Sequence, residues 1–398
     1  MDFQSVNPIN IRLNLISGNL LPMTADDSSY PTFWKIYSAL VWLLELVQTC
    51  VLIPGCIMTP KEKALKDGLI GIVVTIEVLS FFIRIYMRKE LVLKLIRKLD
   101  DILHIQDEMM KSIVMATLQP MDIPLKFYWT AGVMSIFLWG IGPFPLIFEK
   151  NTFFYVEYRM PVVYSKEPIS TSVFVLGNVI VMLSSMYIFT KKVGVDSYMI
   201  HMILLITAQY RYIALKLSMI FQDFKILENN QNNFNEKEYY NETNYKAEKK
   251  IKSLCRHFNA VINISLMLRE LLSVNLSIIY VNSIFRFCCI FIMLISIPAV
   301  SWLDRIVTIM YASGGVVQLF ILTSCVQQLL DASVEITDQA FHEEWYRYGT
   351  SIKSTFMFMI MVNNMGLKIS KFEKYSMSRT SFMTILNQSY SIALLLFT

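Results

Sequence analysis

Residues 306–330 read IVTIMYASGGVVQLFILTSCVQQLL and contain no charged side chain. A helix needs about 20 mostly apolar residues to cross the hydrocarbon core of a bilayer, because each residue advances the helix by about 1.5 Å. Soluble helices of this length normally carry a charged face toward water, and this stretch offers none. It is therefore predicted to be a membrane-spanning helix.

The composition of the whole chain agrees with this prediction. Of its 398 residues, 55% are hydrophobic and 17% are charged, whereas soluble proteins have about 25% charged residues. A soluble fold could not bury so much apolar surface, because its surface-to-volume ratio leaves too few interior positions. The same numbers exclude intrinsic disorder, nucleic-acid binding and a small disulfide scaffold. We expect an all-α membrane protein.

Seven stretches are long and apolar enough to cross the bilayer. The predicted spans are 36–58, 68–87, 127–148, 169–190, 271–300, 306–330 and 380–398. Residues 1–35 precede the first span, and the long loops 88–126 and 191–260 interrupt the unit 36–330 that holds the first six. Residues 331–379 lead to the seventh span.

Three further segments are assigned to the region beside the membrane. The apolar runs 197–210 and 354–367 have 14 residues each, which suits buried or interfacial helices beside the membrane better than crossings. The polar tract 228–244 is typical of a flexible loop. Helical extensions of the fourth and fifth spans, together with residues 331–379, are expected to pack as an intracellular anchor domain where subunits meet.

Basic residues gather on one side of the predicted topology. The N-terminal segment and the loops 88–126, 191–256 and 341–379 hold 26 Lys and Arg, and the remaining loops hold 7. Because Lys and Arg are retained in the cytoplasm, the N-terminus is predicted to be cytoplasmic and the C-terminus extracellular.

Few residues point to catalysis. The four histidines have no metal-ligand spacing, and no phosphate-binding loop or nucleophile turn is present. We therefore expect no enzyme, no cofactor and no metal. Ionisable residues inside a membrane are functional candidates, here Glu45, Glu77, Arg84 and Arg286. We expect Arg84 to reach the lipid headgroups and Glu77 and Arg286 to pair inside the bundle, a role in packing being the simpler explanation.

The outer half of the predicted bundle carries apolar and aromatic side chains at helical spacing. This pattern predicts a cavity for small apolar molecules, with Ser135 and Tyr311 as its polar groups. The candidate lining residues are Val74, Val78, Ser135, Leu138, Trp139, Val179, Met182, Leu183, Met310, Tyr311 and Gly314. Ordinary helix packing explains any one of them, so the prediction concerns the set.

The last 90 or so residues contain the most specific signal. Two groups of residues resemble the sixth span and the final helix of the insect odorant receptors. The matching positions are Gln318, Leu319, Phe320, Cys325, Ser333, Ala340, Phe341, Trp345, Lys353, Ser389, Tyr390, Ser391 and the leucines 394–396. The chain departs from the family at Asn387, where members often have Lys, and at Ile392-Ala393, where many have an aromatic residue and Thr.

The resemblance implies a ligand-gated, cation-permeable channel in the plasma membrane of olfactory sensory neurons. It would assemble as a heterotetramer with the odorant receptor coreceptor and respond to small volatile molecules. Its seventh helix would line the pore, with Ser391, Leu394, Leu395 and Thr398 at the gate, although these leucines could also face lipid. Trp345, Lys353 and Tyr390 would belong to the subunit anchor. The coreceptor has a much longer second intracellular loop, so this length favours a ligand-tuned subunit.

Two other classes of receptor share parts of this pattern. Gustatory receptors are channels of the same superfamily and favour a Thr-Tyr…Gln-Phe ending. The present chain lacks the Gln-Phe part of that motif. A G-protein-coupled receptor would have its N-terminus outside, and neither its acidic-Arg-Tyr motif nor its Asn-Pro-x-x-Tyr motif occurs. A transporter would show two similar halves with broken spans, which we do not find.

Overall fold

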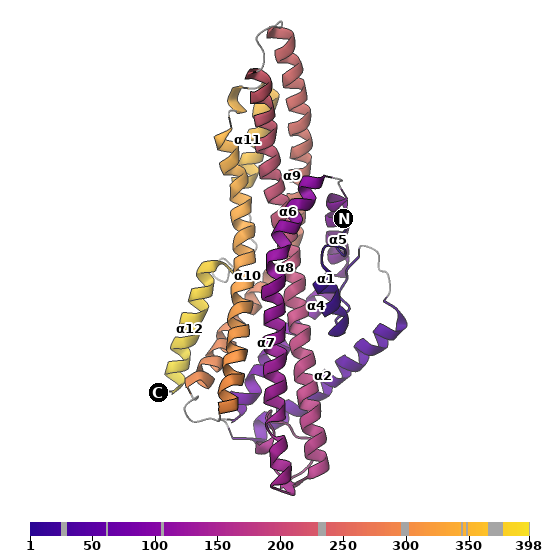
Figure 1. The fold of residues 1–398 in the computed structure, drawn as a ribbon, viewed down its shortest axis with the longest axis vertical. Helices are drawn as coiled ribbons and strands as arrows, with labels where there is room; N and C mark the ends of the chain where they lie inside the picture. Colours follow the sequence, from indigo (N-terminus) through magenta and orange to yellow (C-terminus); the bar gives the residue numbers. More distant parts are fainter. Residues whose placement is uncertain are drawn as a thin grey trace.

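The computed structural model describes residues 1–24, 30–60, 63–104, 107–229, 236–295, 302–343, 345–347, 349–364 and 377–397. Regular structure within these residues is almost entirely helical (Figure 1). The helices are α1 (Pro8–Ile16), α2 (Thr32–Met58), α4 (Leu69–Met87), α5 (Lys89–Leu103), α6 (Glu108–Leu118), α7 (Asp122–Ile141), α8 (Thr171–Asn229), α9 (Glu236–Ile295), α10 (Trp302–His342), α11 (Thr350–Asn364) and α12 (Arg379–Phe397).

Short elements connect these helices. A π-helical turn, η1 (Ala64–Gly68), precedes α4, and two short strands, β1 (Thr152–Phe153) and β2 (Ile169–Ser170), pair as an antiparallel ribbon between α7 and α8. The 3-10 turns are η2 (Gln119–Met121), η3 (Phe144–Phe148), η4 (Tyr155–Glu157) and η6 (Trp345–Arg347). The predicted all-α class is confirmed.

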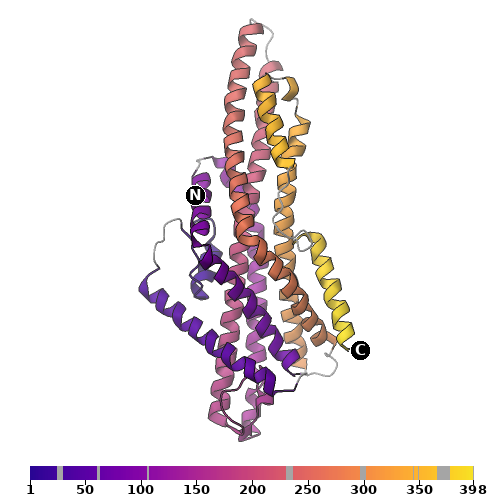
Figure 2. The same ribbon diagram turned by 180° about the vertical axis from the view of Figure 1, so that it is seen from behind.

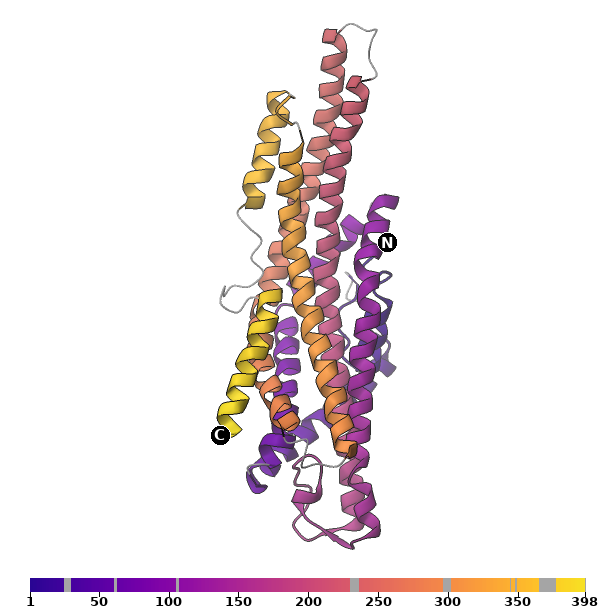
Figure 3. The same cartoon turned by 60° about the vertical axis from the view of Figure 1, so that its left-hand side comes forward.

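Six helical segments among the described residues are long and apolar enough to cross a membrane. They lie in α2, in α4, in α6 with α7, in α8, in α9 and in α10. The predicted seventh span is present as α12, a helix of 19 residues whose hydroxyl and amide side chains lower its mean hydropathy. It packs against α9 and α10 at the edge of the bundle (Figure 3).

Three predicted spans have different ends in the structure. Helix α7 ends at Ile141, because Pro143 and Pro145 cannot donate hydrogen bonds to a continuing helix, and residues 144–148 form η3 instead. Helix α8 begins at Thr171, after the strand residues Ile169 and Ser170. Helix α9 ends at Ile295, and residues 296–300 of the predicted fifth span lie outside the described residues.

Helices α8, α9 and α10 continue well beyond the predicted spans, because none of them contains a proline. Run 197–210, predicted to be a buried or interfacial helix, lies inside α8 and is buried throughout. Tract 228–244, predicted to be a loop, is helical up to Asn229 and again from Glu236. The two helices rise side by side past the other helices (Figure 1). Of run 354–367, the described part belongs to α11.

Helix α8 forms the centre of the molecule. It packs against α10, α9, α7, α6, α4 and α1, so its middle part has neighbours on all sides. The largest hydrophobic cluster runs along it from Val195 to Phe221. Helix α2 crosses the outside of the bundle obliquely (Figure 2) and buries only one face.

Candidate ligand-binding site

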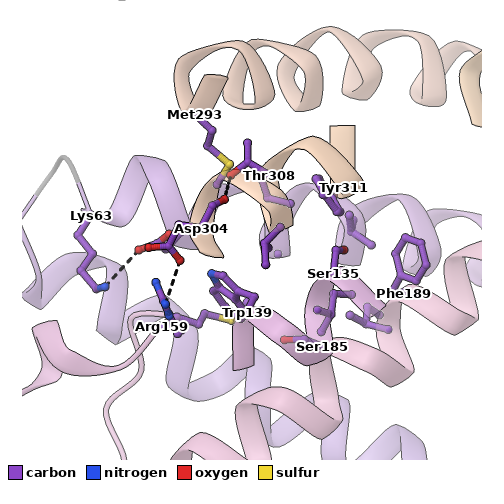
Figure 4. A pocket seen from close by; sticks show the side chains of 18 residues that line it. Lys63, Ser135, Trp139, Arg159, Ser185, Phe189, Met293, Asp304, Thr308 and Tyr311 are labelled. Atoms are coloured by element: carbon purple, nitrogen blue, oxygen red, sulfur yellow. Dashed lines mark hydrogen bonds and ion pairs between the residues drawn. The ribbon is translucent and has the colours of Figure 1, made fainter. Parts of the chain in front are cut away.

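A cavity of about 310 Å³ lies inside the bundle where α4, α7, α8 and α10 meet (Figure 4). Pockets for small molecules typically have about 300–1,000 Å³, so the space suits one small ligand. Its lining residues are Lys63, Asp67, Ile70, Gly71, Val74, Ser135, Ile136, Trp139, Arg159, Met160, Ser185, Ile188, Phe189, Met293, Asp304, Val307, Thr308 and Tyr311.

The walls of the cavity are mainly aliphatic and aromatic. Trp139 from α7, Phe189 from α8 and Tyr311 from α10 contribute rings from three helices (Figure 4). Val74 of α4 and Ile188 of α8 belong to one buried cluster beside them. Walls of this kind bind a ligand by removing apolar surface from water, at about 25 cal/mol per Å².

The segment between α7 and α8, residues 142–170, covers one side of the cavity, and we call it the lid. The antiparallel ribbon pairs β1, within the lid, with β2 at the C-terminal end of the lid. Phe153 in the lid stacks on Phe174 of α8 with ring centroids 4.0 Å apart. The Tyr164 hydroxyl donates a 2.9 Å hydrogen bond to the Gln48 side chain of α2. The lid is therefore a packed structural unit.

The lid approaches α2 closely at Gly55. A Cβ atom added there would lie 2.1 Å from the carbonyl oxygen of Pro161, so this helix position requires glycine. The approach brings Arg159 and Met160, the two residues just before Pro161, to the cavity wall.

Two ion pairs flank one end of the cavity (Figure 4). Lys63 Nζ lies 3.1 Å from Asp67 Oδ2, and Arg159 Nη2 lies 3.0 Å from Asp304 Oδ1. The second pair joins the lid to the start of α10.

Four hydroxyl-bearing residues line the interior. The Ser135 hydroxyl donates to the carbonyl oxygen of Gly132 at 2.8 Å, and the Thr308 hydroxyl donates to that of Asp304 at 2.8 Å. By contrast, the buried hydroxyl oxygen of Ser185 has no hydrogen-bond partner among the residues that the structure describes. Tyr311 is the fourth.

A second, water-sized cavity of about 10 Å³ adjoins the first and shares Val74, Phe189 and Tyr311 with it. Lys192 of α8 and Arg286 of α9 line its other side. A few shared side chains thus separate the main cavity from Lys192 and Arg286.

These charges form a network across the bundle. Lys192 Nζ lies 2.9 Å from Glu77 of α4 and 2.6 Å from Asp196 of α8. Asp196 also accepts a 3.0 Å hydrogen bond from Gln318 of α10, whose side-chain oxygen accepts one of 2.5 Å from Arg286. Glu77 and Arg286 therefore have polar partners inside the bundle, as expected.

The predicted loop 191–260 includes Lys191 and Lys192, but both belong to helix α8. Both are buried in α8. The Lys191 ammonium lies 3.9 Å from the centre of the Trp42 ring of α2. A charge within an apolar run normally indicates the end of a span, but here partners on other helices compensate it. Arg84 also has protein partners, since its guanidinium donates to the carbonyl oxygens of Leu271 and Glu270.

The structure brings part of the predicted ligand set together. Val74, Ser135, Trp139 and Tyr311 line the main cavity, and Gly314 lines the small adjoining one. Val78 lies in the buried cluster beside Val74. The remaining members, which do not contribute to either lining, are Leu138, Val179, Met182, Leu183 and Met310. A role for the set in binding stays a prediction.

The predicted residues of α8 do not lie on the helix face that lines the cavity. Met182 packs against Gly140 of α7, and Leu183 is 42% exposed. The cavity is instead lined by Ser185, Ile188 and Phe189. Their spacing of three and four residues was a detectable signal of one helix face. The spacing does not reveal which face turns toward α4 and α7, however.

The predicted gate residues lie at the edge of the single chain. Ser391 is exposed and donates to the carbonyl oxygen of Asn387 at 2.9 Å. Leu394 and Leu395 are 42% and 76% exposed. Thr398 lies outside the described residues.

The predicted anchor residues are not gathered in one place. Trp345 stacks on Phe356 of α11, with ring centroids 5.5 Å apart. Lys353 lies on the same helix and is half-buried. Tyr390 lies on α12, and its ring packs edge-on against that of Phe291 of α9, with ring centroids 5.7 Å apart.

Comparisons with known proteins agree with this architecture. The family model of the seven-transmembrane odorant receptors matches residues 63–390. The structure of the insect olfactory receptor OR5 from Machilis hrabei is similar over 98% of this chain and 97% of that chain, with a TM-score of 0.73 at 10% sequence identity. The structure of that receptor in complex with eugenol covers 100% of both chains, again with a TM-score of 0.73 at 10% identity.

A comparison with curated protein sequences finds no match. At 10% identity the structural likeness shows a shared fold. The family model covers most of the chain and confirms the resemblance of its C-terminal third. The chain therefore belongs to the seven-transmembrane odorant receptor family.

Proposed function

We propose that this odorant receptor is the ligand-binding subunit of an odorant-gated cation channel in the plasma membrane of olfactory sensory neurons. Its ligand is a small, largely apolar molecule that occupies the cavity between α4, α7, α8 and α10. The observation that carries the proposal is this cavity of about 310 Å³ with mainly apolar walls. The eugenol complex of the Machilis receptor, which shares the fold, supports a small organic ligand.

The pore is formed together with the odorant receptor coreceptor in a heterotetramer. Support comes from α12, which has Thr384, Asn387, Gln388 and Ser391 along its length and a leucine-rich C-terminal end. Polar positions can wet a lumen, and rings of apolar side chains can close it by dewetting. The exposed Leu394 and Leu395 are the part of α12 that another subunit would cover.

The test is current recording from cells that express the chain with and without the coreceptor, using a panel of volatiles. The variant Ile136→Trp fills the cavity, because Ile136 is a lining residue. Its matched control is Phe137→Trp, since the next residue of α7 is 39% exposed and outside the lining. Surface labelling confirms that both variants reach the membrane.

We expect volatile-evoked currents in the wild type and in Phe137→Trp, and their loss in Ile136→Trp. An unchanged response of Ile136→Trp would place the ligand elsewhere. Current without the coreceptor would contradict the obligate partnership. Unchanged ion permeation in Leu395→Ala would contradict the gate, and a G-protein-dependent response that survives pore block would contradict the channel.

A further inference from the structure

We propose that the junction of α4 and α5 binds the headgroup of an anionic phospholipid in the cytoplasmic leaflet of the membrane. The cations that contact the headgroup come from the end of α4 and the start of α5, and we call Arg84, Arg88 and Lys89 the junction cations. They do not belong to the described lining of the ligand cavity, so this inference stands independently of the proposed function.

Positive charge is concentrated in one stretch of the chain around this junction. Residues 84–98 contain six basic side chains and a single acidic one, Glu90. Their net charge of +5 equals that of the whole chain of 398 residues. Clusters of about four to eight Lys and Arg at the cytoplasmic end of a membrane-spanning helix attract anionic lipids, because the cytoplasmic leaflet has a negative surface potential. The stretch 84–98 has this composition.

The structure places this charge where a membrane-length helix ends. Helix α4 is long and apolar enough to cross the membrane up to Met87, and α5 begins at Lys89 with no loop between the two. Helix α5 turns its apolar face, from Val92 to Leu103, into the largest hydrophobic cluster. Its basic side chains Lys94 and Arg97 are therefore exposed on the opposite face.

Two of the junction cations converge on one residue of α9. The Arg84 guanidinium donates to the carbonyl oxygens of Glu270 and Leu271 at 2.6 and 2.8 Å. Nη1 of Arg88, one helical turn further, lies 2.8 Å from the Glu270 carboxylate. One carboxylate thus accompanies two guanidinium groups. The Arg88 and Glu270 side chains are 52% and 48% exposed, and an ion pair so open to solvent contributes little stability. A headgroup phosphate can therefore share the Arg88 guanidinium, whose planar N–H groups can bind two phosphate oxygens at once.

The side chains below the junction suit the remainder of a lipid. In the last turns of α4, Ile83, Tyr86 and Met87 are 57%, 83% and 76% exposed, and Leu266 of α9 is 49% exposed. Tyrosine is enriched at the boundary between hydrocarbon and water, and exposed aliphatic side chains next to it can contact acyl chains. A phospholipid can use the cations and this apolar surface together, whereas a soluble phosphate can use only the cations.

The experiment measures which lipids the purified full-length chain retains. Detergent-solubilised protein is mixed with phosphatidylcholine, phosphatidylserine and a phosphoinositide bisphosphate in equal amounts, and native mass spectrometry counts the lipids that stay bound. The site variant is Arg88→Gln/Lys89→Gln, at two exposed positions. A competition arm adds soluble inositol trisphosphate, which carries the phosphates without acyl chains.

The matched control is Lys249→Gln/Lys252→Gln, which removes the same charge from exposed positions of α9. Lys252 lies 18 residues before Glu270 on that helix, which is about 27 Å along the helix axis. This separation is well beyond the screening length of about 8–10 Å at physiological salt. The control therefore changes the net charge of the protein and leaves the junction unchanged.

We expect the wild type to retain the phosphoinositide over phosphatidylserine, and both over phosphatidylcholine, in the order of headgroup charge. Each Lys or Arg near an anionic surface contributes about fivefold in affinity. The site variant should therefore lose about 10- to 30-fold of the preference for the phosphoinositide, and the control should stay within about twofold of the wild type. Inositol trisphosphate should displace the lipid only at a concentration about tenfold higher or more, because it buries no apolar surface.

Equal retention of the three lipids by the wild type would overturn the inference. Equal losses in the two variants would also overturn it, since net charge alone would then explain the retention. Displacement by inositol trisphosphate at the same concentration as the lipid would show that a phosphate without acyl chains suffices, which contradicts a lipid site. No volatile and no current enters these measurements, so their failure and the failure of the proposed function are distinguishable.

Discussion

The Asp107 carboxylate connects two helices through three hydrogen bonds. Its Oδ1 accepts from the backbone N–H of Met109 at 3.0 Å, which caps the start of α6. Its Oδ2 accepts from the Tyr212 hydroxyl at 2.7 Å and from Lys216 Nζ at 3.1 Å, both on α8. The hydrogen bond from Tyr212, and then the one from Lys216, lower the pKa of Asp107.

Asp107→Ala should lower the free energy of unfolding by about 1–2 kcal/mol, through the lost helix cap and the lost partners. Asp107→Asn keeps the cap and should cost less. Because the pKa of Asp107 is lowered on folding, the charged carboxylate stabilises the fold fully above a pH of about 4, and this contribution disappears as the pH falls through the lowered pKa. Thermal unfolding of the purified protein measures both effects, and equal melting of all three proteins would show the contacts to be unimportant.

Gly132 determines the position of one cavity wall. A Cβ atom added to it would lie 1.9 Å from the Phe189 ring, so the ring packs directly on the backbone of α7. Gly132→Ala should displace Phe189, cost about 1–3 kcal/mol by overpacking and weaken the response to the ligand. The control for stability is Gly315→Ala, whose added Cβ meets Ile290 at an ordinary 3.6 Å. Equal melting temperatures and ligand responses in the two variants would contradict this close contact.

At the scale of helices, the buried charges connect elements that are distant in sequence. Lys192 of α8 has acidic partners from α4 and from α8 itself, and Asp196 also accepts a 3.2 Å hydrogen bond from the Tyr128 hydroxyl of α7. The buried network contains two acidic residues, Glu77 and Asp196, and two basic residues, Lys192 and Arg286. Their formal charges therefore cancel only when all four are present. Breaking one buried ion pair leaves an uncompensated charge, which costs more than the pair contributes.

Lys192→Met should therefore destabilise the protein by about 3–5 kcal/mol. The double variant Lys192→Met/Asp196→Asn removes one charge of each sign and should lose less than the sum of the two single variants. Surface expression and detergent melting temperatures give the comparison. Strictly additive losses would mean that the two residues do not interact.

The helices could largely be predicted from the sequence, but their ends and rotation could not. Apolar length located the six membrane-length segments and α12, because the bilayer sets a minimum length whatever the neighbours are. The helical continuation of α8 past Lys191 depends on partners that only the fold provides. For the cavity, spacing identified the helices involved, whereas Ser185 and the lid residue Met160 depend on helix rotation and on how the lid packs.

At the scale of the whole molecule, the excess of basic residues predicts a cytoplasmic N-terminus. Lys191 and Lys192 are among the 26 basic residues counted on the cytoplasmic side, and both are buried in the bundle. Leaving these two out of the count does not change the predicted orientation. In this orientation the lid is extracellular, and the Asn-Glu-Thr glycosylation sequence at Asn241 is cytoplasmic.

Asn241 should therefore carry no glycan. The substitution Lys150→Asn creates an Asn-Asn-Thr acceptor in the lid, at a side chain that is 51% exposed, and should add one glycan. Glycosidase treatment followed by gel mobility gives the readout. A mobility shift in the wild type together with none in Lys150→Asn would invert the topology.

The central claim is that a small ligand binds between α4, α7, α8 and α10. The most direct measurement is a cryo-electron microscopy map of the chain with its coreceptor and an activating volatile. The account predicts ligand density enclosed by Trp139, Phe189 and Tyr311. Ligand density elsewhere, with this cavity empty, would contradict it.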